Sequence, residues 1–361
     1  MSKILYAASS SSHLQAFHTP YVEALRNDGH TVVTLGGGDG SDLNIAFEKK
    51  YLSRVNAQSR KEVKKILAKE NFDVVIVNTT LAAFHIRRAL PNKNAPRLVN
   101  VVHGYLFPEF AKGIKANIRR FLLLSAEKML RKKTDAIVVM NAEDLRIAVT
   151  NNLINTPPYH INGMGVPKKA HNSTPDKLKA NLGFEGKQLL TFVGELSARK
   201  NQAFLILAMP KILEKHPKAH LLLVGEGADC EKLSDLIKEK DLESCVTLLG
   251  RRNDVADILA ATDVYVSAAK SEGLPFNIVE ALAEGNQIVA SAVKGHTDIL
   301  EDGAGILFES ENLEEYVRSV CAVLAKEKSS DEELIRKAYE RFSLPTVFPE
   351  TYRVLKEASN L

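Results

Sequence analysis

The segment Ser271–Glu284 reads SEGLPFNIVEALAE and joins a turn to a predicted helix. Glu272 lies in the turn, and Glu280 follows eight positions later, a little over one turn into the helix. Pro275 suits the first helical position, where its missing N–H costs nothing. The next backbone N–H groups then point forward, and such a helix end attracts phosphate. A flanking carboxylate accepts hydroxyl groups rather than phosphate, so the arrangement predicts a ligand with phosphates between two sugars, such as a nucleotide-sugar.

Several other motifs stand in order around this segment. The chain resembles the retaining glycosyltransferases of family 4 in this E-x7-E pattern and in FVGELSARKNQ (192–202), LLLVGEG (221–227) and VTLLGRRNDV (246–255). The first half is similar to the bacterial capsule and exopolysaccharide transferases of that family in HLQAFHTPYVEAL (13–25), NVVHGYLF (100–107) and NAEDLRIA (141–148). Several motifs in register are far more specific than one alone.

Short apolar runs alternate with helical periodicity along the chain, which is typical of parallel α/β sheets. We expect two doubly wound, Rossmann-like domains, 1–165 and 166–344, and a helix over 345–361. The resemblance implies the GT-B fold, with the domains facing each other across a cleft and the last helix crossing back to the first domain. It also implies that the first domain binds the acceptor and the second the nucleotide-sugar donor. The runs in the first series are Lys3–Ala8, Thr31–Leu35, Asp73–Asn78, Leu98–Val102, Asp135–Met140 and Tyr159–Asn162, and helical periodicity includes Leu14–Asp28.

Composition agrees with an ordinary globular protein, with 361 residues, 45% hydrophobic and 25% charged. Only three cysteines occur, without a CxxC pair or a His/Cys cluster, which favours a reducing compartment without a structural metal. No apolar stretch approaches the ~20 residues that span a bilayer. We therefore expect a cytoplasmic protein.

Charge is unevenly distributed. The net charge is +4, but residues 1–165 hold 23 Lys and Arg against 13 Asp and Glu. Eight of these basic residues lie in 112–133, where Ile114, Ile118, Phe121, Leu122, Ser125, Met129 and Leu130 share one predicted helix face. A packed helix with a solvated basic edge fits this pattern. A helix that meets anionic lipid fits it too. The resemblance to transferases with lipid-linked acceptors favours a peripheral position at the inner face of the cell membrane, with contacts at Lys112, Lys115, Arg119 and Arg120.

The loop after Val193 supplies cations for a donor. Open α/β sheets bind ligands beyond the carboxyl ends of their strands, and Arg199 and Lys200 lie in such a loop. There they can neutralise the diphosphate leaving group. The family usually carries an arginine directly after Gly194, whereas this chain has Glu195.

The resemblance assigns the remaining donor contacts. Glu280 is expected to accept the ribose hydroxyls and Glu272 those of the donor sugar. Gly194 is expected to belong to the donor site, Gly225 and Gly227 to let the backbone approach the nucleotide, and Arg251 to contact the base. The backbone at Gly273, Leu274, Phe276 and Asn277 is expected to contact sugar and phosphates.

In the first domain, His103 follows a buried strand. The matching family histidine lies near the anomeric region of the donor sugar, so His103 joins Lys200 and Glu272 as an expected catalytic residue. The first strand is followed by ASSSSH in place of the family's glycine-rich loop. This change favours acceptor-side contacts, for which the candidates are Ser12, His13, His18 and Asn78.

The mechanism that the resemblance implies is sugar transfer with retention of configuration. No DxD motif occurs, so we expect transfer without a metal or other cofactor. The expected donor is a UDP-sugar, the expected acceptor a polyprenyl-diphosphate-linked glycan of capsule, exopolysaccharide or related synthesis, and no nucleic acid is expected. A nucleotide-sugar epimerase of the same fold and a non-catalytic assembly partner remain as alternatives. A dehydrogenase is disfavoured because GxGxxG is missing after the first strand.

Overall fold

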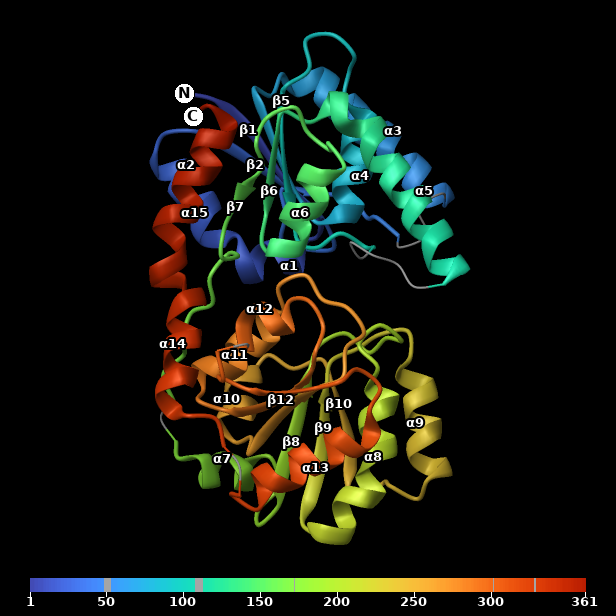
Figure 1. Cartoon of the computed structure of the whole chain (residues 1–361). Helices are drawn as coiled ribbons and strands as arrows, with labels where there is room; N and C mark the ends of the chain where they lie inside the picture. The colour runs from blue at the N-terminus through green and yellow to red at the C-terminus, as the bar shows by residue number, and fades with distance from the viewer. Residues whose placement is uncertain (49–52, 108–112, 172, 301, 328) are drawn as a thin grey trace. The chain divides into compact units, whose positions relative to one another are not determined.

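The computed structural model describes residues 1–48, 53–107, 113–171, 173–300, 302–327 and 329–361. The chain divides into two compact units, one of Met1–Gly165 with Pro345–Leu361 and one of Val166–Leu344. Each unit contains a parallel β-sheet with helices on both faces (Figure 1). Among the described residues, no helix combines the length and apolar character needed to cross a membrane.

The sheet of the first unit has seven parallel strands in the order β3-β2-β1-β4-β5-β6-β7. The order reverses between β1 and β4, as in a doubly wound fold. β4 reads VVIVN and is buried at every position, which fits a strand covered on both faces. The strands are β1 (Lys3–Ser10), β2 (Thr31–Gly37), β3 (Leu43–Asn44), β4 (Val74–Asn78), β5 (Arg97–Val102), β6 (Ala136–Val139) and β7 (Tyr159–His160).

The first helical segment differs from its prediction. A single helix was expected over Leu14–Asp28, but the structure has two helices that meet at His18. Pro20 explains the break, because it has no N–H to donate and its ring clashes with the preceding turn. The helices are α1 (Ser11–Phe17), α2 (Thr19–Asn27), α3 (Arg54–Glu70), α4 (Thr80–Ala89), α5 (Ile114–Leu130), α6 (Ala142–Thr150) and α15 (Leu344–Ser359), with a 3-10 turn η1 at Arg131–Lys133.

The second unit repeats the plan with six parallel strands in the order β10-β9-β8-β11-β12-β13. Its order reverses between β8 and β11, the position at which doubly wound sheets bind ligands. The strands are β8 (Gln188–Val193), β9 (Ala219–Val224), β10 (Val246–Gly250), β11 (Val264–Ser267), β12 (Gln287–Ser291) and β13 (Ile306–Phe308). The helices are α7 (Pro175–Asn181), α8 (Gln202–Lys215), α9 (Cys230–Glu239), α10 (Val255–Ala260), α11 (Phe276–Ala283), α12 (His296–Leu300), α13 (Leu313–Leu324) and α14 (Glu332–Phe342).

The last helix, α15, packs on the first unit, as predicted. Asp28 at the end of α2 accepts hydrogen bonds from Tyr352 Oη at 2.9 Å and from Lys356 Nζ at 2.8 Å. Arg97 Nε donates to the carbonyl of Ala358 at 2.7 Å. Thr351 adds a buried bond to the carbonyl of Gly163 at 3.1 Å. These contacts hold the C-terminus of the chain against its first strands and helices.

Candidate active site

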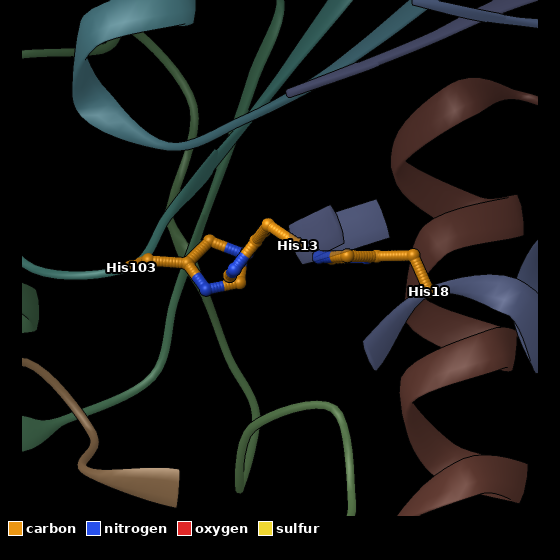
Figure 2. A group of neighbouring side chains, drawn as sticks. All are labelled: His13, His18 and His103. Atoms are coloured by element: carbon orange, nitrogen blue, oxygen red, sulfur yellow. The ribbon is translucent and has the colours of Figure 1, made fainter. Parts of the chain in front are cut away.

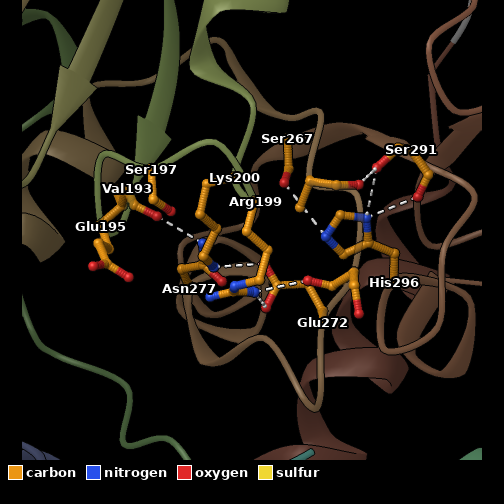
Figure 3. A network of polar contacts seen from close by, with 12 residues as sticks. Val193, Glu195, Ser197, Arg199, Lys200, Ser267, Glu272, Asn277, Ser291 and His296 are labelled. Atoms are coloured by element: carbon orange, nitrogen blue, oxygen red, sulfur yellow. Dashed lines mark hydrogen bonds and ion pairs between the residues drawn. The ribbon is translucent and has the colours of Figure 1, made fainter. Parts of the chain in front are cut away.

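Glu272 lies between two cations in the second unit. Its side chain is 7% exposed, Lys200 Nζ lies 2.6 Å from Oε1, and Arg199 Nη1 donates to Oε2 at 2.9 Å. Figure 3 shows both cations directed at this carboxylate. Burial alone would raise the pKa of Glu272, but Lys200 and then Arg199 outweigh it and hold the pKa below its usual value. The cluster carries one net positive charge, which suits an anionic ligand.

The loop that carries Lys200 is fixed by its own side chains. Asn201 adopts a left-handed backbone conformation with φ of 58° directly before α8. Gln202 at the start of α8 accepts from the backbone N–H of Ser197 at 3.2 Å and donates to the carbonyl of Glu195 at 2.8 Å. The carbonyl of Arg199 accepts from the backbone N–H of Lys270 at 2.8 Å. The two loops that present Lys200 and Glu272 are therefore tied together by backbone as well as by charge.

The structure explains why glycine is required at the positions after β9, which the sequence did not reveal. A Cβ at Gly225 would collide with the carbonyl oxygen of Gly194, and one at Gly227 with that of Leu196. The loops also exchange hydrogen bonds, from Gly194 N to Val224 O at 2.9 Å and from Leu196 N to Glu226 O at 2.9 Å. Close approach of one loop to the other already requires these glycines, whether or not a nucleotide approaches them.

The helix α11 begins one residue later than predicted. Pro275 precedes it as the capping residue, and Phe276 is the first helical residue. Glu280 follows just over a turn later, as expected, and is partly buried. The side chain of Asn277 donates through Nδ2 to the carbonyl of Val193 at 2.6 Å. Its amide group therefore fastens α11 to the end of β8.

His296 supports this region from behind. It is fully buried, its Nδ1 donates to the carbonyl of Ser291 at 2.8 Å, and its Nε2 lies 3.3 Å from the hydroxyl of Ser267. A Cβ at the neighbouring Gly295 would lie 3.0 Å from the Cβ of Glu272. Through these contacts His296 supports the turn that carries Glu272.

Two basic residues at the end of β10 differ in their surroundings. Arg252 donates twice to Asp254, at 2.8 and 2.5 Å, and this pair is held at the start of α10. Arg251 is exposed at the strand end. Its expected contact with a nucleotide base stays a prediction.

In the first unit, His103 comes together with two histidines from the start of the chain, His13 and His18 (Figure 2). His13 lies on α1, His18 at the junction of α1 and α2, and His103 directly after β5. The ring centroids are 5.1 Å apart for His13 and His18, 4.9 Å for His13 and His103, and 5.3 Å for His18 and His103. Sequence reasoning placed His103 near the donor and the other two near the acceptor, and missed that they form one cluster. The signal available was that β1 and β5 both end at the same edge of the sheet.

Burial keeps these imidazoles neutral. It lowers the pKa of His13 to about 4. Burial also holds the pKa values of His18 and His103 well below their usual value, and neighbouring imidazoles add to the effect. Behind the cluster, Tyr6 Oη lies 3.0 Å from His18 Nδ1. Asn78 is fully buried and donates to the carbonyl of Ala7 at 3.3 Å, so its expected contact with an acceptor would require its neighbours to move.

The expected serine loop after the first strand is absent: Ser10 ends β1, and Ser11 and Ser12 begin α1. Ser10 caps α1 by accepting from the N–H of His13 at 3.3 Å. Ser11 is buried and donates to the carbonyl of Gly38 at 2.8 Å. Ser12 is exposed, with its hydroxyl 3.2 Å from that of Ser10. Of the hydroxyls from Ser10 to Ser12, that of Ser12 is the best placed for an external ligand.

Comparison with known proteins identifies the family. Residues 174–341 match the model described as "Glycosyl transferases group 1", and residues 21–154 match "Glycosyltransferase Family 4". The two matches fall in the two units and agree with each other. The chain belongs to the family 4 glycosyltransferases.

Two relatives that match most of the chain agree with this assignment. EpsD of Bacillus subtilis (strain 168), assigned as a glycosyltransferase, is 26% identical over 83% of this chain and 81% of its own length. The Escherichia coli UDP-Gal:alpha-D-GlcNAc-diphosphoundecaprenol alpha-1,3-galactosyltransferase is 26% identical over 72% of this chain and 68% of its own. The structure of HepE from Anabaena with UDP and glucose has a TM-score of 0.78 at 20% identity, and the alignment covers 99% of this chain and 100% of that one. The predicted GT-B fold is confirmed.

In this family 4 glycosyltransferase, the helix predicted from the basic segment is α5. The apolar face that was predicted for it is exposed. Ile114 is 81% exposed and Phe121 67%, and Ile118, Leu122 and Met129 are also exposed. The buried side is instead formed by Leu124, Glu127 and Leu130. The prediction that Leu130 lies on the same helix face as Ile114, Ile118 and Phe121 is therefore wrong.

The charged side chains of α5 lie on both its buried and its exposed sides. Glu127, the one acid of the basic segment, is buried and accepts a hydrogen bond from each Nη group of Arg87, both at 2.8 Å. The ion pair ties α5 to α4. Lys115 and Arg119 are exposed and Arg120 is partly buried, while Lys112 lies outside the described residues. An ordinary packed helix does not account for the exposed apolar side chains beside these cations.

Glu280 gives the glycosyltransferase a testable pH dependence. Burial raises its pKa from 4.5 to about 7, and Lys169 opposes the shift. A carboxyl whose pKa is raised on folding stabilises the fold fully below its unfolded pKa, and this contribution is lost as pH rises through the folded pKa. The wild type should therefore lose up to about 3 kcal/mol relative to Glu280→Gln between pH 4.5 and 7.5.

The measurement is the melting temperature of both proteins across this pH range without ligand. Titration of the buried histidines is common to both, so the difference between the two curves isolates Glu280. Parallel curves would show that Glu280 titrates near its ordinary value in the folded protein.

Proposed function

We propose that this glycosyltransferase moves a sugar from a UDP-sugar to a lipid-linked glycan in cell-surface polysaccharide synthesis, with retention of anomeric configuration. The observation that carries the proposal is the buried Glu272 held by Lys200 and Arg199 at the carboxyl edge of β8 and β11, directly before α11. The loops after β8 and β11 bring three features together: a carboxylate that suits sugar hydroxyls, two cations, and a helix start that suits phosphates. Support for UDP comes from HepE, described with UDP and UDP-glucose. Support for the acceptor comes from the E. coli relative, whose name specifies a diphosphoundecaprenol-linked sugar.

The chemistry follows from the charges. As the bond between the anomeric carbon and the diphosphate oxygen breaks, negative charge grows on the diphosphate. Lys200 and Arg199 stabilise this charge, since cations already fixed in a low-dielectric site need little reorganisation. Glu272 then binds hydroxyls of the sugar, and Glu280 binds those of the ribose. The acceptor hydroxyl attacks the same face of the sugar, and its proton passes to the departing diphosphate.

The two units divide these tasks. The second unit binds the nucleotide-sugar through the residues above, with Arg251 at the base and the backbone of 273–277 at sugar and phosphates. In the first unit, His103 acts beside the anomeric carbon as a neutral hydrogen-bonding group. His13, His18 and Ser12 lie on the acceptor side. Transfer needs no metal ion.

The test is a panel of nucleotide-sugars incubated with the enzyme without acceptor. We expect slow release of UDP and free sugar from one UDP-sugar, and the same rate after rigorous chelation. An epimerised nucleotide-sugar as product would favour the epimerase, and recovery of activity only with manganese or magnesium would contradict transfer without metal. If no nucleoside diphosphate raises the melting temperature, the chain is an assembly partner rather than an enzyme.

We further propose that α5 docks on the anionic inner surface of the cell membrane. Its exposed apolar side chains lie beside exposed cations, a combination that complements apolar lipid tails below anionic headgroups. The buried pair of Arg87 and Glu127 holds the opposite side of the helix in the fold. The occupant that fits this helix face is therefore a lipid surface.

Vesicle binding checks this proposal. Phe121→Ser with Ile118→Ser should weaken binding to anionic vesicles at least ~10-fold, because each apolar side chain contributes roughly 1.5–3 kcal/mol when fully buried. Arg119→Ala should weaken it about fivefold, since each cation near such a surface contributes about 1 kcal/mol. The control is Lys64→Ala, an exposed lysine on α3. Equal binding of all variants, or equal binding to neutral vesicles, would refute docking through α5.

A further inference from the structure

The histidine cluster of the first unit has the composition and spacing of a metal site. Each of His13, His18 and His103 offers a ring nitrogen, and these atoms all lie within 4.8 Å of one another. Among the residues that the structure describes, this is the one group of three or more His, Cys, Asp or Glu side chains placed to share an ion. His103 follows β5, far in sequence from His13 and His18, so the fold itself brings it to them.

Two of the ring nitrogens are buried without another task. Within the described part of the chain, Nε2 of His13 and Nε2 of His18 have no hydrogen-bond partner. A buried polar atom without a partner is costly, and such an atom in a native protein calls for an explanation. A metal ion that accepts both lone pairs would supply one.

The surroundings of His18 also fit a ligand. Tyr6 Oη lies 3.0 Å from His18 Nδ1, and when Oη accepts a hydrogen bond from Nδ1–H, the lone pair of His18 is left on Nε2. Histidines that bind metals usually make such a hydrogen bond with their second nitrogen, and it fixes the ring. Figure 2 shows the ring of His18 directed toward those of His13 and His103, which overlap in this view. His13 and His103 are partly exposed, so an ion can enter from their side.

We propose that His13, His18 and His103 bind one divalent transition-metal ion of the zinc class through their ring nitrogens. Imidazole suits Zn²⁺, Co²⁺, Ni²⁺ and Cu²⁺, whereas Mg²⁺ and Ca²⁺ prefer oxygen ligands. Zn–N bonds of about 2.0–2.1 Å require nitrogens about 3.3 Å apart. Rotation of the rings that moves the nitrogen atoms by about 1 Å would bring them to this spacing. Three protein ligands leave the fourth position for water.

The bound ion is an inhibitor rather than a cofactor. It occupies the ring nitrogen of His103, which the proposed transfer reaction uses, so this consequence rests on the proposed function. Binding itself does not, and it is measured without any sugar donor. A failure of metal binding and a failure of transfer can therefore be told apart.

The experiment titrates Co²⁺ and Zn²⁺ into the untagged, chelator-treated full chain. We expect a single ion per chain and a Co²⁺ absorption spectrum without the thiolate charge-transfer band that cysteine ligands would give. His13→Ala and His103→Ala should each weaken binding at least ~10-fold, and Tyr6→Phe, which removes the support of His18, should weaken it by about 10-fold. His160→Ala changes an exposed histidine of the same unit and should leave binding unchanged.

His18 is fully buried, so His18→Gln is informative only if it folds, and the partly exposed His13 keeps the test decisive. Unchanged affinity in His13→Ala and His103→Ala would overturn the proposal. So would a thiolate band, which would place the ion at a cysteine such as the exposed Cys230. Absence of saturable binding would show that the three histidines pack against one another without an ion.

Discussion

Replacing Lys200 with alanine is expected to lower kcat by about 10²–10³-fold, the usual effect of removing one preorganised group that stabilises developing charge. Lys200 is nearly buried, and its Nζ lies 2.6 Å from Glu272 at the edge where the diphosphate is proposed to bind. Without it, Arg199 alone remains to balance Glu272 and the leaving group. The melting temperature should fall by a few degrees as well, because a buried carboxylate loses part of its compensation.

The measurement is the rate of transfer, or of donor hydrolysis, together with a melting curve. The matched control is Lys270→Ala, in the neighbouring loop, whose ammonium group pairs with the exposed Glu311 at 2.6 Å. Surface pairs of this kind contribute ~0–1 kcal/mol, so this variant should keep both activity and stability. Near-normal turnover in Lys200→Ala would mean that the donor binds elsewhere.

Glu272→Gln is expected to separate sugar transfer from nucleotide binding. Transfer should fall by about 10²-fold, because a neutral amide accepts the sugar hydroxyls more weakly than a carboxylate. UDP should bind as well as before or more tightly. In the unliganded protein, Glu272 neutralises part of the charge of Lys200 and Arg199, and the variant leaves that charge available to the diphosphate.

Calorimetric titration with UDP and a kinetic assay on the same preparation check this separation. Glu311→Gln, which changes the exposed acid of the neighbouring pair, is the control. If UDP affinity falls in step with turnover, Glu272 contributes to the fold of the loop rather than to the sugar, and its role in the donor site would have to be abandoned.

Much of the second unit could be predicted from sequence because its signals are local. Each strand is a short apolar run followed by a turn, and the E-x7-E segment keeps its two carboxylates within one loop and helix. The approach of Lys200 to Glu272 follows from topology, since β8 and β11 are neighbours and end at the same edge. Even so, Pro275 proved to be the residue before α11 rather than its first residue.

The features that escaped prediction depend on contacts between distant segments. The histidine cluster needs the ends of β1 and β5 in space, and it needs the break at Pro20 that places His18 outside a regular helix. The buried side of α5 follows from Arg87, which lies far away in sequence and draws Glu127 inward. A helical wheel contains neither piece of information, so it grouped the buried Leu130 with the exposed apolar side chains.

The close packing of the loops after β8 and β9 bears on how such a transferase can change its donor during evolution. No side chain fits at Gly225 or Gly227, because the backbone of Gly194 and Leu196 occupies that space. A single substitution there must be matched by a shift of the opposite loop, so these two loops are constrained to vary as a pair. The exposed end of β10 at Arg251 carries no such constraint. New donor preferences are therefore more accessible to mutation, and to laboratory selection, at this strand end than at the glycines.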